Sequence, residues 1–146
     1  MKELNLKKNQ KINKMYISTK TFDNFSCAIR QHRASHSHCM LIHGYSFYFK
    51  VWFASNEILE ENQLDDMGWV VDFGGFKSQP KGNGLKDWLN EMFDHTLLLQ
   101  EDDPYIDIFE NLEQFKVCKL IKLKKIGAES LAKYVFDKFN DVLSKT

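Results

Sequence analysis

Residues 43–54 read HGYSFYFKVWFA, and they form the clearest structural pattern in this chain of 146 residues. Side chains alternate between two faces with a period of two, which predicts a β-strand that buries one face. One face carries Tyr45, Phe47, Phe49, Val51 and Phe53, and the other carries Ser46, Tyr48, Lys50 and Trp52. The strand is long enough to organise a sheet around it.

Other segments add strands and helices around this one. Residues 15–29 are rich in β-branched and aromatic side chains and predict a strand, with a bend or bulge at Asp23 and Asn24. Short strands are expected at residues 69–73 and within residues 116–123. The predicted strands and helices together favour the α+β class.

Helical spacing of apolar residues appears in two places. Leu85, Trp88, Leu89 and Met92 have this spacing, and so does the segment that begins near Ala128. In the second segment the apolar positions are Leu131, Val135, Phe139 and Val142. Residues 102–114 are acidic and predict a loop with a short helix. No repeat divides the pattern, so residues 15–146 are expected to form a single domain.

The first fourteen residues, MKELNLKKNQKINK, are polar and rich in lysine and asparagine. Residues 1–14 are interpreted as a flexible tail, or as an extension upstream of the true start. They lack the apolar stretch of a signal peptide. A mitochondrial presequence is a further alternative, against which stand the lack of arginine and the presence of Glu3.

Composition excludes several classes of partner. The formal net charge is zero, so no global field attracts nucleic acid or an anionic membrane. No apolar run approaches the roughly 20 residues of a membrane span. Three cysteines without a secretory leader argue against a disulfide framework. A cytoplasmic location is therefore expected.

Two groups of residues have the potential for chemistry. Residues 36–45, HSHCMLIHGY, place three histidines beside a cysteine, which suits zinc binding or an activated thiolate. The alternative is a set of surface or hydrogen-bonding histidines. Asp94 and His95 follow a predicted helix, where a carboxylate can fix the tautomer of a histidine. Their alternative role is a helix-end cap with a polar partner.

Six segments in the same order resemble the 6-pyruvoyl- and 6-carboxy-tetrahydropterin synthase family. The resemblance runs from about Tyr16 to Phe139. The segments are residues 25–29 (FSCAI), Cys39, residues 42–45 (IHGY), residues 68–77 (GWVVDFGGFK), residues 94–95 (DH) and residues 127–133 (GAESLAK).

The resemblance implies a fold, an assembly and a reaction. The fold would be the tunnelling fold, an antiparallel sheet with helices on one face that oligomerises into a barrel. Family members form ring-shaped trimers that pair into hexamers, with sites between protomers. The reaction would be that of a lyase converting 7,8-dihydroneopterin triphosphate into a 6-substituted tetrahydropterin. The carboxy-forming branch would serve 7-deazapurine (queuosine-type) synthesis, and the pyruvoyl branch tetrahydrobiopterin.

The resemblance also assigns roles to residues. Cys39 would act as general base, tuned by Asp94 and His95, with a small buried residue as its alternative role. Glu129 matches a glutamate at the start of the last helix. It is either a contact to the pterin substrate or a favourable charge at a helix N-terminus.

The zinc site of the family is altered in this chain. Of three histidine ligands only His43 remains, because Ile29 and Tyr45 stand at the other two positions. Cys27 lies two residues before Ile29 on the same strand face, and His38 or His36 could reach in from the loop. A set of Cys27, His43 and His38 would suit zinc. The alternative is that Cys27 packs in the core and no metal binds.

The end of the chain is a second departure. Family members have a final strand after the last helix, with a glutamate that binds the pterin ring. This sequence ends at Thr146 without that strand. Either the sequence is truncated or the gene has diverged. These departures keep a second hypothesis open, which is a non-catalytic homologue that binds a pterin or purine after losing the zinc site.

Overall fold

The computed structural model describes residues 15–55, 64–76 and 84–143. It contains two compact units, Met1–Thr19 with Trp52–Asp72 and Lys20–Val51 with Phe73–Thr146. The second unit holds every residue that the sequence marks for chemistry. The predicted tail at residues 1–14 lies outside the described residues, and a single domain over residues 15–146 stays a prediction.

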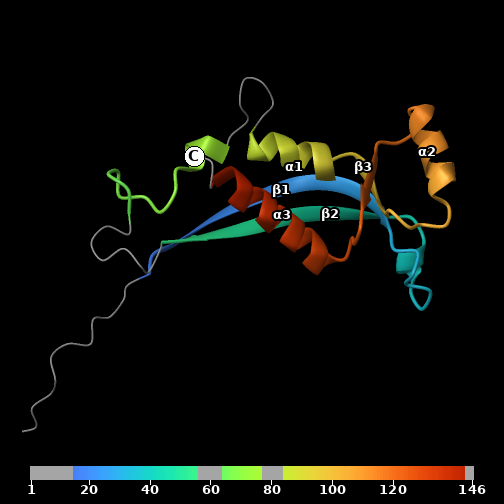
Figure 1. Cartoon of the computed structure of the whole chain (residues 1–146), viewed down its shortest axis with the longest axis horizontal. Helices are drawn as coiled ribbons and strands as arrows, with labels where there is room; N and C mark the ends of the chain where they lie inside the picture. Colours follow the sequence, from blue (N-terminus) through green and yellow to red (C-terminus); the bar gives the residue numbers. More distant parts are fainter. Residues whose placement is uncertain (1–14, 56–63, 77–83, 144–146) are drawn as a thin grey trace, which may run out of the picture. The chain divides into compact units, whose positions relative to one another are not determined.

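One four-stranded sheet forms the framework (Figure 1). Its strands, in spatial order, are β2 (His43–Ala54), β1 (Ile17–Arg30), β3 (Thr96–Gln100) and β4 (Leu120–Leu123). The alternation predicted for β2 is confirmed, because its odd-numbered positions from Phe47 onward are more buried than the even-numbered ones.

The sheet is mixed, so the prediction of an antiparallel sheet was wrong. Strands β1 and β3 pair in parallel, and so do β3 and β4. Strand β2 runs antiparallel to β1. Two backbone contacts show this direction, since Cys39 O accepts from Gln31 N and Gly44 lies beside Cys27 O. The connections that precede β3 and β4 each contain an α-helix, whereas the connection between β1 and β2 contains only the short 3₁₀ helix η1 (His38–Met40).

Strand β1 bends where the sequence predicts it. Asn24 adopts a left-handed backbone conformation with φ 68°, which asparagine tolerates better than most residues. The bend changes the register of inward-facing side chains from even to odd positions. Phe22 and Phe25 are consequently both buried, although they are three residues apart.

Helices α1 (Leu85–Phe93) and α3 (Ala128–Leu143) pack against one face of the sheet (Figure 1). Three ring contacts define this packing. They join Phe22 to Phe139 at 5.5 Å between centroids, Phe49 to Phe93 at 4.8 Å, and Trp88 to Tyr134 at 5.6 Å.

Helix α2 (Ile106–Gln114) packs on the opposite face, which corrects the prediction that all helices share one face. Leu97 and Leu99 of β3 form a cluster with Phe109 of α2 and with Leu120. Leu98 lies between these two leucines, is fully buried and points to the other face of the sheet. It is in register with Ile29, which shares that face with Phe25. A strand buried on both faces needs cover on both sides.

The strand predicted at residues 69–73 does not form. Asp65 Oδ1 instead accepts from the backbone N–H groups of Met67 and Trp69, at 3.0 and 2.8 Å. Gly68 completes this turn with φ 78°. The local turn uses the backbone donors that a neighbouring strand would need. A short 3₁₀ helix follows at Phe73–Phe76. Among the described residues, no helix has the length and apolarity needed to cross a membrane.

Candidate active site

Asp94 and His95 form a side-chain pair directly after α1. The distance between His95 Nδ1 and Asp94 Oδ2 is 3.0 Å. Neighbouring residues rarely meet in this way, but here His95 has φ 55°, which turns its side chain back toward Asp94. Two bonds hold the turn to β1, because Ser26 N donates to Asp94 Oδ1 at 3.0 Å and His95 N donates to Ser26 O at 2.7 Å.

The hydrogen bonds to Asp94 set the charge of this carboxyl group. The hydrogen bond from the Ser26 backbone, followed by the bond from His95, lowers the pKa of Asp94 below its ordinary value. The carboxylate is therefore ionised at neutral pH and favours a proton on His95 Nδ1. The His95 side chain is 87% exposed, so its Nε2 faces open solvent and can exchange a proton with a ligand.

Cys39 lies in the loop that joins β1 to β2. It occupies the middle of the short helix η1 (His38–Met40), and it is half-buried. Two bonds fix its backbone. Cys39 N donates to Ser37 Oγ at 3.0 Å, and Cys39 O accepts from Gln31 N at 2.8 Å. The thiol therefore stands at a defined place beside the end of β1.

Cys39 and the Asp94–His95 pair are attached to the sheet at different places. Their anchors are Gln31, directly after the end of β1, and Ser26 within β1, which are five residues apart in sequence. A strand rises about 3.3 Å per residue, so the anchors are separated by about 16 Å. The resemblance groups these three residues, whereas the fold attaches Cys39 at Gln31 and the Asp94–His95 pair at Ser26.

Glu129 lies at the same end of β1 as Cys39. It is exposed in the first turn of α3. A Cβ atom placed on Gly127 would lie 3.6 Å from Glu129 Oε2 and 3.8 Å from Gln31 Nε2. Gln31 is the residue that binds the Cys39 backbone. The start of α3 and the cysteine loop therefore approach each other around Gln31.

His43 is oriented like a metal ligand. Its Nδ1 lies 2.8 Å from Leu41 O, so a proton there is donated to this carbonyl and Nε2 carries a lone pair. Nε2 is buried and has no hydrogen-bond partner among the described residues. The ring of His38 lies 5.7 Å away between centroids, and that of Tyr45 lies 4.9 Å away.

The other proposed ligands do not complete a set around His43. Cys27 is only 5% exposed, and burial together with the charge of Asp94 raises its pKa to about 11. It is therefore a protonated core thiol at neutral pH. Ile29, at a family ligand position, is also buried. Over residues 15–55, 64–76 and 84–143, no three His, Cys, Asp or Glu side chains gather in a metal-binding arrangement.

Sequence reasoning missed a polar cluster at the beginning of the cysteine loop. Arg30 forms an ion pair with Asp103, whose side chain is fully buried. His32 lies between the acids, with Nδ1 3.8 Å from Asp103 and Nε2 3.9 Å from Asp102. Arg33 pairs with Asp102 at the surface. The signal was present in the acidic residues 101–103, directly after the end of β3.

A sequence model described as 6-pyruvoyl tetrahydropterin synthase matches residues 17–146. This chain belongs to that family. Among its curated relatives is a 6-carboxy-5,6,7,8-tetrahydropterin synthase from Rickettsia felis, 34% identical over 65 residues, which are 44% of this chain and 39% of the relative. The Rickettsia bellii protein of the same name is 31% identical over 86 residues, or 59% of this chain and 53% of the relative.

These curated relatives match over only about two fifths to a half of their own length. A solved structure of an uncharacterized protein from Wolinella succinogenes is similar over more of the chain. It covers 86% of this chain and 83% of that protein, with a TM-score of 0.64 and 16% identity. At that identity the likeness concerns the fold alone. Membership of the synthase family therefore rests on the match over residues 17–146.

Proposed function

We propose that this member of the 6-pyruvoyl tetrahydropterin synthase family is a subunit of a pterin-forming lyase. Its substrate would be 7,8-dihydroneopterin triphosphate and its product a 6-carboxy-tetrahydropterin, an intermediate of 7-deazapurine (queuosine-type) synthesis. The relatives named 6-carboxy-5,6,7,8-tetrahydropterin synthase support the carboxy-forming branch. A 6-pyruvoyl product is the other outcome that the family allows.

The Asp94–His95 pair is the observation that carries this proposal. A lyase of this type must move protons on the side chain of the pterin. An ionised carboxylate that holds His95 at Nδ1 leaves Nε2 available to accept or donate such a proton. In the same scheme Cys39 abstracts a proton as a thiolate, and Glu129 binds donor groups of the pterin ring through charge-assisted hydrogen bonds.

The separation of Cys39 from this pair supports a site built between copies of the chain. The two anchors are about 16 Å apart along the direction of β1, so the cysteine loop and the Asp94–His95 turn are attached at different positions along the sheet. In a symmetric ring, Cys39 of one protomer can face the pair of the next protomer. We accordingly propose a trimeric or hexameric barrel as the active form.

Zinc remains part of the proposal through His43. Its Nε2 is buried, has no hydrogen-bond partner among the described residues and carries the lone pair that a metal would need. His38 is a neighbouring imidazole that could join it. Cys27 would have to be deprotonated before it could bind zinc, and burial raises the pKa of its thiol. Because the described residues of one chain do not gather three ligands, no step of the proposed reaction is routed through a metal.

Turnover of 7,8-dihydroneopterin triphosphate tests the proposal. The natural full-length protein should form a 6-substituted tetrahydropterin, and both Cys39→Ala and His95→Ala should lower kcat by about 10²-fold or more. Lys116→Ala, an exposed change at the end of α2, is the matched control and should leave turnover unchanged. A folded, oligomeric protein with no turnover would exclude the lyase.

A non-catalytic pterin- or purine-binding homologue is the second candidate. The buried Ile29 favours it, because an aliphatic side chain at a family ligand position cannot bind zinc. This candidate predicts that neopterin or guanine binds in calorimetry while dihydroneopterin triphosphate is not consumed. Metal content adds a second criterion, since close to one zinc per chain, lost in His43→Ala, would favour the enzyme.

A further inference from the structure

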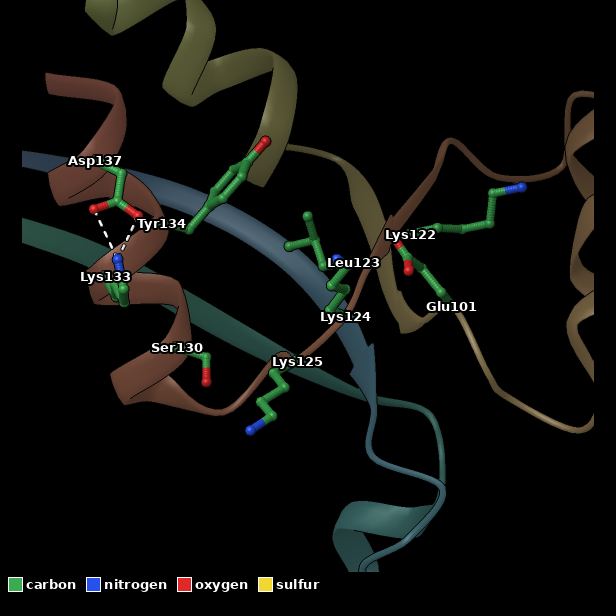
Figure 2. Close-up of a pocket in the computed structure, with 9 residues that line it drawn as sticks. All are labelled: Glu101, Lys122, Leu123, Lys124, Lys125, Ser130, Lys133, Tyr134 and Asp137. Atoms are coloured by element: carbon green, nitrogen blue, oxygen red, sulfur yellow. Dashed lines mark hydrogen bonds and ion pairs between the residues drawn. The ribbon is translucent and has the colours of Figure 1, made fainter. Parts of the chain in front are cut away.

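A hollow of about 620 Å³ opens between β4 and α3 (Figure 2). Its volume falls in the range of small-molecule sites. The residues that line it are Glu101, Lys122, Leu123, Lys124, Lys125, Ser130, Lys133, Tyr134 and Asp137. Four lysines therefore face two carboxylates, so the lining carries a net positive charge.

The lysines of the hollow differ in how far they are already neutralised. Lys122 is paired with Glu110 at 2.5 Å and extends away from the other lysines in Figure 2. Lys133 is paired with Asp137 at 2.6 Å. Within the described parts of the chain, no carboxylate pairs with Lys124 or Lys125. These two ammonium groups are therefore available to an anion.

Hydrogen-bond donors accompany this charge. Ser130 contributes a hydroxyl from the first turns of α3, close to Lys125 in Figure 2. Tyr134 lines the hollow with a ring that packs on Trp88, with 5.6 Å between centroids, and its hydroxyl points toward α1 in Figure 2. A lysine ammonium offers three donors as a compact charge and is a common phosphate ligand. Several charges spread over a hollow of this size suit a chain of phosphates better than one phosphate.

We propose that this hollow binds a polyphosphate chain, with Lys124 and Lys125 as its principal ligands and Ser130 as an additional donor. The residues that line the hollow do not include those that the proposed reaction uses as acid and base. The inference rests on the proposed function only for the origin of the phosphates, because the proposed substrate carries a triphosphate. Free triphosphate or a nucleotide would present the same chemistry.

Binding of inorganic triphosphate, measured by calorimetry without divalent metals, tests the site directly. Wild-type protein should bind it, and the double variant Lys124→Gln/Lys125→Gln should bind at least about tenfold more weakly, equal to about 1.4 kcal/mol. Binding should also weaken with added salt, since exposed charges are screened. The matched control is Lys86→Gln/Lys116→Gln, which removes the same charge from other exposed positions and should leave the affinity unchanged.

The inference is overturned if wild-type protein does not bind triphosphate, or if the double variant binds it as tightly as wild type. Steady-state kinetics then identify the source of the phosphates. A raised KM with unchanged kcat in the double variant, and competitive inhibition by triphosphate, assign the hollow to the substrate. Weakened triphosphate binding with unchanged KM assigns it to a free polyphosphate. Because binding is measured without turnover, failure of the lyase proposal leaves this test intact.

Discussion

At the scale of single residues, burial separates two cysteines of the same chemistry. Cys27 lies inside β1 with 5% of its surface exposed, and desolvation is the main reason that its pKa rises to about 11. Cys39 lies in a half-buried loop with only its backbone fixed. Reactivity of a thiol follows the thiolate fraction and access, so the two residues should behave differently.

Thiol labelling checks this difference. At pH 7.5 iodoacetamide should modify Cys39 in the folded protein and leave Cys27 unmodified until the chain is denatured. Mass spectrometry of proteolytic peptides gives the order of modification. Cys39→Ala serves as control, because it should remove the fast site without exposing the slow one. Modification of Cys27 at the rate of Cys39 would contradict the buried, protonated thiol.

Asp94 should contribute a pH-dependent stability. Its folded-state pKa is lowered, so its contribution is present above the unfolded value of about 3.9 and disappears as pH falls through the folded value. Asp94→Asn should therefore lower Tm at pH 7, and the difference from wild type should vanish in strong acid. Glu91→Gln removes an exposed carboxylate of α1 and is the control. A Tm difference independent of pH would count against the ionised carboxylate.

At the scale of elements, β1 works as two segments joined at a bend. Asn24 at φ 68° allows Phe22 to meet Phe139 of α3 while Phe25 meets Phe49 of β2. A straight strand would turn one of these rings to the other face. The bend is therefore the element that lets one strand contribute to two parts of the core.

Substitution at the bend tests this role. Asn24→Val should destabilise the protein by about 1–2 kcal/mol, because a β-branched residue is strained at positive φ. Asn24→Gly should be neutral or slightly stabilising, since glycine adopts this conformation freely. Urea denaturation measures both variants. Equal stability of the valine and glycine variants would mean that the bend does not exist in solution.

The ion pair of Arg30 and Asp103 joins the end of β1 to the turn after β3. The Asp103 side chain is fully buried, and that of Arg30 is 11% exposed. Asp103→Asn should cost about 3 kcal/mol, because it leaves a largely buried guanidinium without its counter-charge. Asp102→Asn is the matched control, since Asp102 is half-exposed and should cost less than about 1 kcal/mol. Similar losses in the two variants, measured by urea denaturation, would argue against a special role for the buried pair.

At the scale of the whole molecule, we propose that the reaction depends on more than one chain. Cys39 and Glu129 gather near Gln31 at one end of β1, whereas Asp94 and His95 are held at Ser26. A rotation axis can bring these two groups of neighbouring copies together without any change of fold. The oligomer would then create the active site and not merely stabilise it.

Mixing two inactive variants tests a shared site. Cys39→Ala and His95→Ala protein, refolded together in equal amounts, should regain about a quarter of wild-type activity, because random mixing leaves that share of interfaces with both native groups. Each variant alone should stay inactive. If the mixture is also inactive while mixed oligomers are present, both groups act within one chain.

The sequence by itself determined the elements that have a regular local pattern. The alternation in residues 43–54 predicted β2, and the helical spacing after Ala128 predicted α3. The resemblance to the synthase family also came from the sequence alone, through residues 25–29, 42–45 and 94–95. Such signals are readable because side-chain periodicity follows from backbone geometry alone.

Tertiary structure decided what depends on contacts between distant segments. The run of leucines in β3 has no alternation, because both of its faces are covered, so its strand and its parallel pairing were not predicted. The pairing of Arg30 with Asp103 spans 73 positions. The distance between Cys39 and the Asp94–His95 pair depends on where each is attached along β1. These attachments cannot be predicted from local sequence, because the register of each strand depends on how all strands and helices pack around one core.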